Sequence, residues 1–443
     1  MKVTQGFVRS ATAVVVAVLM AAAAAAPLHA AGPVLFYEEV EKDGRIYVFN
    51  TPERLQIWKE SGEMGAAVTL VGRGANGETI VAENEVAIDM YLFKHNLPGY
   101  DRPTAPPPPP PPTYPQVKVG GLAYLSYQNG TTKGVDYSKV TIKRGYILVN
   151  ATINSFFGAR LTPDVTQDDT GDIKLRIKYA YGQFKWAKSG FLTKPNVEFG
   201  VAHMPWLDFE EHVNMFRMQD TMFMERNGLF NSADVGVTFA ALLGPELDDT
   251  YKKAVSSYYP GKYGSFSFGV YNGSGYHAKE KNENKVVEGR VTVRPIPNQL
   301  PGLQVSYFGI AGKGNTEKEP DWLVNTLMGS YQHKYLVLTG TWYDGKGNQS
   351  GSAVDADGKA LERDGWSFFT QLRPTPDWSV IVRYDFFDPN KDVEDDGNKR
   401  TIVGVAYEFA HHNYLLFDYD RVDYEKSGVD ADDRLQLTLQ VSF

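Results

Sequence analysis

The sequence contains no cysteine among its 443 residues. This absence excludes disulfide bonds, thiolate metal centres and c-type haem attachment, which needs Cys-x-x-Cys-His. No apolar run long enough for a membrane-spanning helix occurs beyond the extreme N-terminus. The eight histidines are scattered, without a Ser/His/acid arrangement or a His-x-x-x-His pair. We therefore predict that the protein is not an enzyme, and we assign no catalytic residue, no metal ligand, no cofactor and no nucleic-acid partner.

The N-terminus has the pattern of a secretory signal. Lys2 and Arg9 precede an apolar run from Ala13 to Ala26, and small residues follow at Ala30 and Ala31. This is a charged region, an apolar region and a cleavage site, so residues 1–31 are expected to be removed as a signal peptide. No cysteine follows the apolar run, which excludes a lipoprotein anchor.

Residues 32–100 are predicted to form a small α+β domain in the periplasm. Arg45 to Phe49 has a strand pattern, and Thr51-Pro52 has the residue types of an N-cap followed by a first helical residue. Ser61-Gly62 ends that helix. A hairpin over 68–71 and 79–81 and a second helix over 86–95 complete the domain.

Residues 101–115 are predicted to be a proline-rich linker. Seven consecutive prolines run from Pro106 to Pro112. Such a run forms a stiff polyproline II helix that rises about 3.1 Å per residue. It separates two folded units.

The last ten residues predict the fold of the remainder. Leu435, Leu437, Leu439, Val441 and Phe443 alternate with polar residues, which gives a strand with one apolar and one polar face. With a secretion signal and a terminal aromatic residue, this pattern predicts a transmembrane antiparallel β-barrel over 116–443, in the bacterial outer membrane and in contact with its lipid. We place about sixteen strands, at 116–127, 138–155, 158–167, 173–186, 196–204, 232–243, 264–273, 286–296, 303–314, 322–333, 335–346, 365–373, 378–388, 401–411, 413–424 and 433–443.

The connections between these runs alternate in length. Those after odd-numbered runs are long and polar, including Asn129 to Tyr137, and most of the others are short. Long outer loops and short periplasmic turns are expected of such barrels, which also places residues 32–100 in the periplasm. Gly244 to Tyr263 breaks the rule, so this connection is either an elaborated turn or hides a strand pair.

The connection from Pro205 to Asn231 is the best candidate for a pore constriction. It is the third outer loop and is rich in Met and Phe, so we expect it to fold inward against the barrel wall. Arg217 and Arg226 would then either project into the pore or pair with Glu211, Asp220 or Glu225. The methionines could instead bind a soft metal such as Cu(I).

The fourth strand gives the clearest signal for the pore wall. If Ile173, Leu175, Ile177 and Tyr179 face lipid, Lys174, Arg176 and Lys178 form a row in the lumen that would attract anions. Arg290, Arg294 and Arg383 have the same inward parity. The alternative is an ordinary lumen in which acids such as Glu288, Asp385, Asp418 and Glu408 balance these cations.

Several short motifs resemble the phosphate-selective porin family (O and P type) of sixteen-stranded outer-membrane channels. The motifs are Ile142–Tyr146 with Val149–Thr152, Arg160–Asp164, Lys178–Tyr181, Gly200 with Pro205-Trp206, Phe223–Arg226 and Ala233–Val237. The resemblance implies passive diffusion through a barrel that is usually a homotrimer, with inward Arg and Lys guiding anions. The third loop is poorer in Lys than the family pattern, and the N-terminal domain and proline linker are additional. The arrangement also resembles, more loosely, porins of selenite, tellurite or metal-reduction systems.

The sequence thus predicts an outer-membrane porin for small solutes, with anions and oxyanions as the expected class. The rival hypothesis is an interaction protein that the barrel anchors in the membrane. In that case residues 32–100 would dock an envelope or electron-transfer partner.

Overall fold

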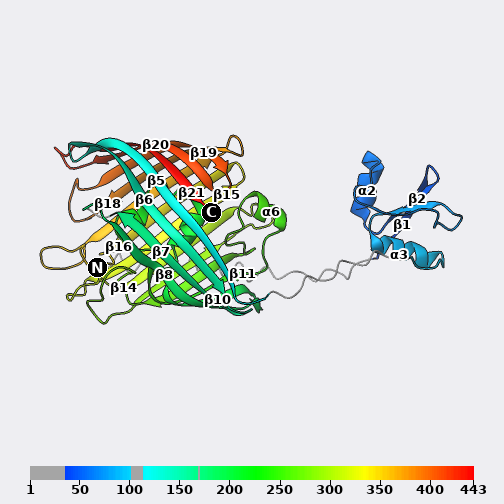
Figure 1. Ribbon diagram of the computed structural model, residues 1–443, viewed down its shortest axis with the longest axis horizontal. Coiled ribbons are helices and arrows are strands. Elements are labelled where there is room, and N and C mark those ends of the chain that lie inside the picture. The colour runs from blue at the N-terminus through cyan, green and yellow to red at the C-terminus, as the bar shows by residue number, and fades with distance from the viewer. Residues whose placement is uncertain (1–34, 101–112, 168–169) are drawn as a thin grey trace. The chain divides into compact units, whose positions relative to one another are not determined.

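The computed structural model describes residues 35–100, 113–167 and 170–443. The predicted signal peptide and nearly all of the predicted proline linker lie outside these residues. The chain divides into two compact units, with the boundary between Pro111 and Pro112. In Figure 1 the first unit is coloured in shades of blue and the second from cyan to red.

The N-terminal unit is a four-stranded sheet with a helix on each face. Its strands are β1 (Glu38–Lys42), β2 (Arg45–Phe49), β3 (Val68–Leu70) and β4 (Thr79–Ala82), in the order β1-β2-β4-β3. Val48 and Phe49 point to opposite faces of the sheet because they are neighbours in a strand. Val48 packs with helix α3 (Glu85–Lys94), whereas Phe49 packs with Leu55 and Trp58 of helix α2 (Pro52–Ser61).

The helix boundaries of this unit follow the sequence signals, with one difference. Thr51 is the N-cap residue of α2, Pro52 is its first residue, and Gly62 follows with a positive φ of 76°. However, the Thr51 hydroxyl donates to the Glu83 carboxylate instead of capping its own helix. Glu83 also accepts the backbone N–H groups of Asn50 and Thr51, so it joins β4 to the start of α2.

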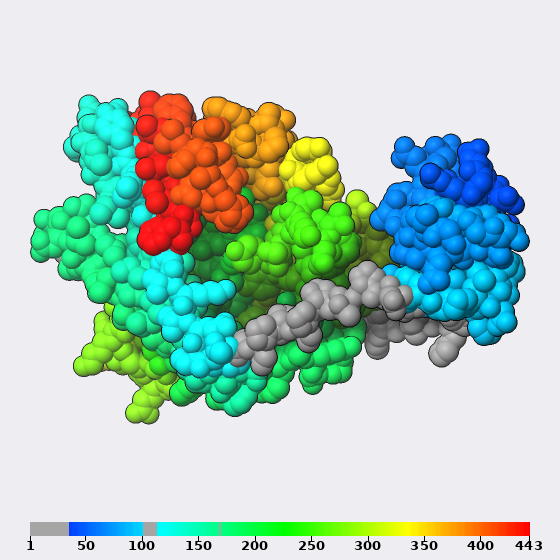
Figure 2. Space-filling model, turned by 45° about the vertical axis from the view of Figure 1, so that its right-hand side comes forward, coloured from blue at the N-terminus to red at the C-terminus, as the bar shows by residue number. Residues whose placement is uncertain are grey.

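The second unit is a closed antiparallel barrel of sixteen strands, as the alternation predicted. Every strand-like run of the sequence corresponds to one strand, and β21 closes the ring by pairing with β5 (Figures 1 and 2). The strands are β5 (Gln116–Thr132), β6 (Val135–Thr152), β7 (Phe157–Gln167), β8 (Ile173–Lys185), β10 (Leu192–His203), β11 (Ala233–Leu243), β12 (Gly264–Tyr271), β13 (Val286–Val293), β14 (Leu303–Lys313), β15 (Asp321–His333), β16 (Leu336–Lys346), β17 (Glu362–Leu372), β18 (Trp378–Asp388), β19 (Asn398–Ala410), β20 (Asn413–Tyr424) and β21 (Asp432–Ser442), with a two-residue strand β9 (Lys188–Ser189) beside β10.

The outer surface of the barrel is an apolar band. On β21, Leu435 and Leu437 are exposed on the outer surface, whereas Gln436 and Thr438, which alternate with them, are buried inside the barrel. On β18, Val382 faces outward while Arg383 and Asp385 are buried. Apolar residues outside and polar residues inside are the reverse of a soluble protein and suit a barrel surrounded by lipid. No helix in the described part of the chain has the length and apolarity needed to cross a bilayer.

Two connections differ from the simplest prediction. The predicted long loop Asn129 to Tyr137 is wrong: β5 and β6 pair up to Thr132 and Val135, and Lys133-Gly134 alone form the turn. Both turn residues have positive φ, the conformation of a tight two-residue hairpin. Residues 129–138 are mostly polar and include two glycines, so their sequence has the composition of a loop. The connection 244–263 hides no strand pair, because β11 pairs directly with β12; it is an elaborated turn with helix α6 (Asp249–Ala254).

The prediction that Tyr179 faces lipid is also wrong. Its side chain is buried inside the barrel, with its ring centroid 4.1 Å from that of His203. The ladder between β7 and β8 pairs Thr162 with Tyr179 and Pro163 with Ile177, which leaves Lys178 without a cross-strand partner. Proline has no N–H to donate to the ladder, so Pro163 coincides with a β-bulge. The bulge reverses the alternation, and both Lys178 and Tyr179 point inward.

Candidate functional site

The connection 204–232, here called the inner loop, folds into the barrel, as its apolar composition predicted. It contains helices α4 (Leu207–Val213) and α5 (Phe223–Arg226). Its side chains form one continuous apolar cluster with side chains of the inner wall. Trp206 stacks on Phe308 of β14, and Phe223 contacts Phe387 of β18. The buried apolar residues of the loop are Met204, Trp206, Leu207, Phe209, Val213, Phe216, Met218, Met222, Phe223, Met224, Leu229 and Phe230.

A carboxylate near the middle of the inner loop binds cations of the wall. The Asp220 carboxylate lies 2.8 Å from the guanidinium of Arg400 and 2.9 Å from that of Arg434. Arg226, also on the loop, lies 3.5 Å from the same carboxylate. Asp420 of β20 binds Arg400 and Arg434 from the other side. We call these five residues the Asp220 cluster.

Next to the Asp220 cluster, wall side chains bind the backbone of the loop. Lys143 donates to the carbonyls of Met218 and Gln219, at 2.7 and 2.9 Å. Gln436 donates to the Gln219 carbonyl at 2.6 Å, and Arg383 donates to the Thr221 carbonyl at 2.9 Å. Side chains from β6, β18 and β21 therefore fix residues 218–221 by their main chain.

A second charged group lies within the loop itself. The Arg217 guanidinium is buried and lies 2.6 Å from Glu211 and 2.5 Å from Glu225. Of the two alternatives stated for Arg217 and Arg226, the structure therefore shows pairing with acids. Arg226 is paired with Asp220 and lies 3.7 Å from Asp385.

The six predicted wall residues differ in their surroundings. Arg290 is buried and donates to the Pro205 carbonyl at 2.9 Å. Its guanidinium carbon lies over the ring of Phe209, 4.2 Å from the ring centroid. Arg383 is buried between Asp385 and the loop. Arg294 donates to the Gly261 carbonyl at 3.1 Å, so it holds the connection 244–263 and not the inner loop.

The three cations of β8 do not form one uniform row. Lys174 is exposed and Arg176 is half-buried, opposite Asp164 of β7. Lys178 is buried at the bulge, and its ammonium lies 4.6 Å from the centre of the Tyr146 ring. The bulge at Pro163 therefore gives Lys178 an environment different from that of Lys174.

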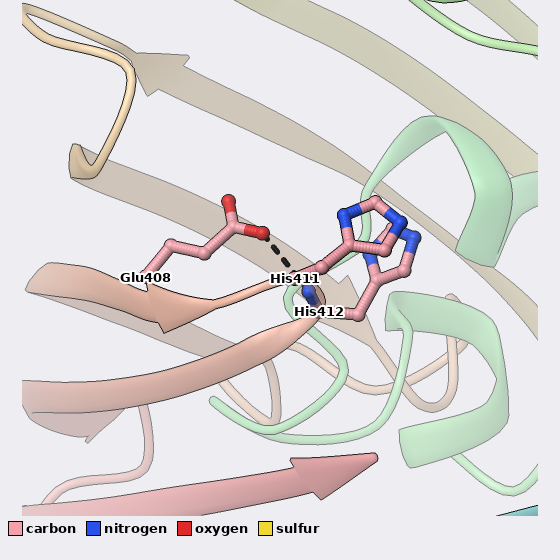
Figure 3. A group of neighbouring side chains, drawn as sticks. All are labelled: Glu408, His411 and His412. Carbon is pink, nitrogen blue, oxygen red and sulfur yellow. Dashed lines mark hydrogen bonds between the residues drawn. The ribbon is translucent and has the colours of Figure 1, made fainter. Parts of the chain in front are cut away.

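The structure also brings together a group of residues that the sequence did not single out as a site. Glu408, His411 and His412 meet at the turn between β19 and β20, and their ligand atoms all lie within 4.8 Å of one another (Figure 3). The adjacent histidines were visible in the sequence. Glu408 was not expected near them, because a bulge between Glu408 and Ala410 aims its carboxylate at the turn.

No protein-family model matches the sequence, and no curated protein is detectably similar to it. The fold, in contrast, is similar to solved structures. An anion-selective porin from Comamonas acidovorans aligns over 74% of this chain and all of its own, with 12% identity and a TM-score of 0.54. OmpF of Salmonella typhi, in complex with daunomycin, aligns over 74% of this chain and 97% of its own, with 12% identity and a TM-score of 0.51.

A loop L8 deletion mutant of OmpT, an outer membrane protein of Vibrio cholerae, is also similar, with 12% identity and a TM-score of 0.50 over 74% of this chain and 99% of its own. These similarities establish a barrel fold shared with outer-membrane porins. At this identity they carry no information on individual residues.

Proposed function

We propose that the protein is an outer-membrane porin through which small solutes diffuse passively. One observation carries the proposal: a closed barrel with an apolar outer surface holds a long connection inside its lumen, between charged walls. An apolar exterior suits lipid, and an inward loop narrows a water-filled barrel to a selective passage. The resemblance to the phosphate-selective porins supports the same function. It also leads us to propose that the protein is a homotrimer, which sedimentation analysis in detergent can test.

We further propose that the passage prefers small anions, including oxyanions such as phosphate, selenite and tellurite. The supporting observation is the arrangement of charges around the inner loop, which carries Arg217 and Arg226 as well as carboxylates and faces wall acids such as Asp420 as well as wall cations. Arg290, Arg383, Arg400 and Arg434 are wall cations, and the inner loop supplies carboxylates at Asp220, Glu211 and Glu225. Lys174 is exposed and Arg176 is half-buried on β8, and both lie outside the apolar cluster that the loop forms with the wall. Anions entering along β8 would meet these cations first.

A planar bilayer experiment tests both parts of the proposal. Reversal potentials are measured under a KCl gradient for the wild type and for the triple variant Lys174→Gln, Arg176→Gln, Lys178→Gln. The control is Lys188→Gln, Lys334→Gln, Lys426→Gln, which removes the same charge from exposed positions. We expect a potential toward the chloride side that weakens in the first variant and persists in the control. Cation selectivity of the wild type contradicts the anion preference and leaves a general porin.

A second candidate function rests on the N-terminal unit. Helix α3 exposes Phe93 (90% accessible) and Val86 (55%) on one side, whereas its opposite side is buried in the core. A partner macromolecule that contacts this side of the helix would cover these two apolar side chains. In this alternative the barrel is an anchor and residues 32–100 dock an envelope or electron-transfer partner in the periplasm. A chain lacking residues 33–115 distinguishes the two functions, since a porin without this part still conducts.

A further inference from the structure

The turn between β19 and β20 carries two adjacent histidines and a nearby carboxylate. Ala410 pairs with Asn413, so His411 and His412 alone form the turn. The centroids of the two imidazole rings are 4.0 Å apart, and Figure 3 shows both rings on the same side of the turn. One nitrogen of each imidazole and one Glu408 oxygen all lie within 4.8 Å of one another.

One residue of this turn, His412, has a left-handed backbone conformation. His412 has a φ of 57°, in the left-handed region that glycine and asparagine adopt most readily. Its N–H donates to the Glu408 carboxylate at 2.9 Å, so the conformation that costs energy also joins two of the three donor residues.

Neighbouring strands hold the turn in place. The carbonyl of His411 accepts from the Asn413 side chain, and the carbonyl of His412 accepts from Gln440 of β21, both at 2.9 Å. Asn413 is itself bonded to the backbone of Ser442. The Glu408 N–H donates to the Asp377 carbonyl at 2.7 Å, in the neighbouring turn between β17 and β18.

These bonds occupy the backbone and part of the Glu408 carboxylate, which also hydrogen-bonds with the Tyr414 side chain, and they leave the imidazoles available. Within the described part of the chain, neither imidazole has a hydrogen-bond partner, and their one ring contact is with each other. Two neutral imidazoles and a carboxylate are ligands that Zn²⁺, Ni²⁺ and Cu²⁺ favour. Ligands about 2.0–2.2 Å from such an ion lie roughly 3.4 Å from each other, so side-chain rotations alone would close this group around one ion.

We propose that Glu408, His411 and His412 form a binding site for a divalent first-row transition-metal ion at the rim of the barrel. The three residues supply three ligands, and water or a donor from a bound molecule completes the coordination. The site lies at the end of the barrel that carries the short turns. Metal binding at this site does not require that the barrel conducts.

The test is metal binding by the full chain, folded in detergent and purified without a polyhistidine tag. Titration calorimetry with Zn²⁺ measures stoichiometry and affinity, and electron paramagnetic resonance with Cu²⁺ counts coordinated nitrogens. We expect one ion per chain with splitting from two nitrogens. His411→Asn and His412→Asn should each leave one nitrogen and weaken binding by at least about tenfold, as should Glu408→Gln, which leaves both nitrogens.

The matched control is His333→Asn. His333 is the last residue of β15, at another short turn of the same barrel end, and its ring contacts Tyr331 and Tyr335 instead of a second histidine. This variant should bind metal like the wild type. Heat-dependent gel mobility and the β-sheet circular dichroism of each variant show whether the barrel has folded.

Two results would overturn the proposal. One is equal affinity and an equal nitrogen count in the wild type and in the double variant His411→Asn, His412→Asn, which would mean adventitious binding elsewhere. The other is the absence of nitrogen splitting and binding heat for the folded wild type at about 1 mM metal. Neither result depends on whether the protein is a porin.

Discussion

The Asp220 carboxylate, on the inner loop, lies 2.8 Å from the guanidinium of Arg400, on strand β19. The two residues are 180 positions apart in the sequence. Arg400 and its neighbour Arg434 would repel each other without an acid between them. The contact therefore fixes the loop to the wall, and together with Asp420, which binds the same two guanidinium groups, it neutralises this pair of like charges.

We predict that Asp220→Asn loosens the inner loop and raises single-channel conductance. Removing one partner of a largely buried ion pair costs about 3–5 kcal/mol, because the remaining charges are left without a partner. Here we expect this cost to reduce mainly the free energy with which the loop binds the wall. Conductance in planar bilayers and protease cleavage within residues 214–222 measure the effect. Asp249→Asn is the control, since Asp249 pairs with Lys252 at an exposed site outside the inner loop. Unchanged conductance and cleavage in Asp220→Asn would contradict this role for the Asp220 cluster.

Arg290 and Arg294 provide a matched pair for a second prediction. Both are buried in the lumen, but Arg290 binds the start of the inner loop at Pro205, whereas Arg294 binds residues 259–261. Arg290→Met should increase amide hydrogen exchange over 204–213, because the Pro205 carbonyl and the Phe209 ring lose their cationic partner. Arg294→Met should increase exchange mainly over 255–263, with a smaller effect on 204–213 through the contacts of Tyr259 with Asp208 and Phe209. Equal effects of both variants on both segments would mean that the arginines stabilise the barrel in general.

The bulge at Pro163 can be tested by labelling single introduced cysteines, because the protein has no cysteine of its own. Ile177 and Phe184 are both exposed on the outer surface, although an unbroken strand would place them on opposite faces. Single cysteines at 177 and 184, labelled with a fluorophore, should both be quenched by a lipid-soluble quencher, and a label at 179 should not. Quenching at 177 and 179 but not at 184 would indicate continuous alternation and no bulge.

The strands were predictable because each one separates lipid from the lumen. Leu435, Leu437 and Leu439 face outward while Gln436 and Thr438 face inward, and this physical requirement repeats around the barrel. The inward folding of the loop was predictable for a similar reason, because residues such as Met222 and Phe223 are too apolar for an outer loop. The pattern of residues within one segment was therefore sufficient to predict its structure wherever burial or contact with lipid alone determined that structure.

The partners of the inner loop were not predictable, because they come from distant strands. Nothing local in the sequence indicates that Arg400 meets Asp220 or that Lys143 binds the carbonyls of 218 and 219. Bulges were the second limit. Pro163 reverses the faces of β8, and the bulge after Glu408 creates the group with His411 and His412. A bulge shifts the parity by one residue, which the alternation pattern does not reveal.

The last prediction concerns the N-terminal unit and its pH dependence. Glu39 of β1 accepts from Tyr37, from His95 at 2.8 Å and from Lys94 at 3.0 Å. Partial burial raises the pKa of Glu39, but these hydrogen bonds outweigh burial and hold its pKa below the ordinary value. A carboxyl with a lowered pKa stabilises the folded state above its unfolded pKa of about 4.3 and loses this contribution as the pH falls through the folded pKa.

We therefore expect the N-terminal unit to open more readily as the pH falls below about 4.3. Hydrogen exchange of peptides within 35–100 of the full chain, corrected for the intrinsic pH dependence of exchange, measures this opening. Glu39→Gln should remove much of the pH dependence by lowering protection already at pH 7. Glu38→Gln changes the same charge at the exposed neighbouring position and should behave like the wild type. A wild-type response that Glu39→Gln leaves intact would assign the acid sensitivity to another carboxylate of the unit.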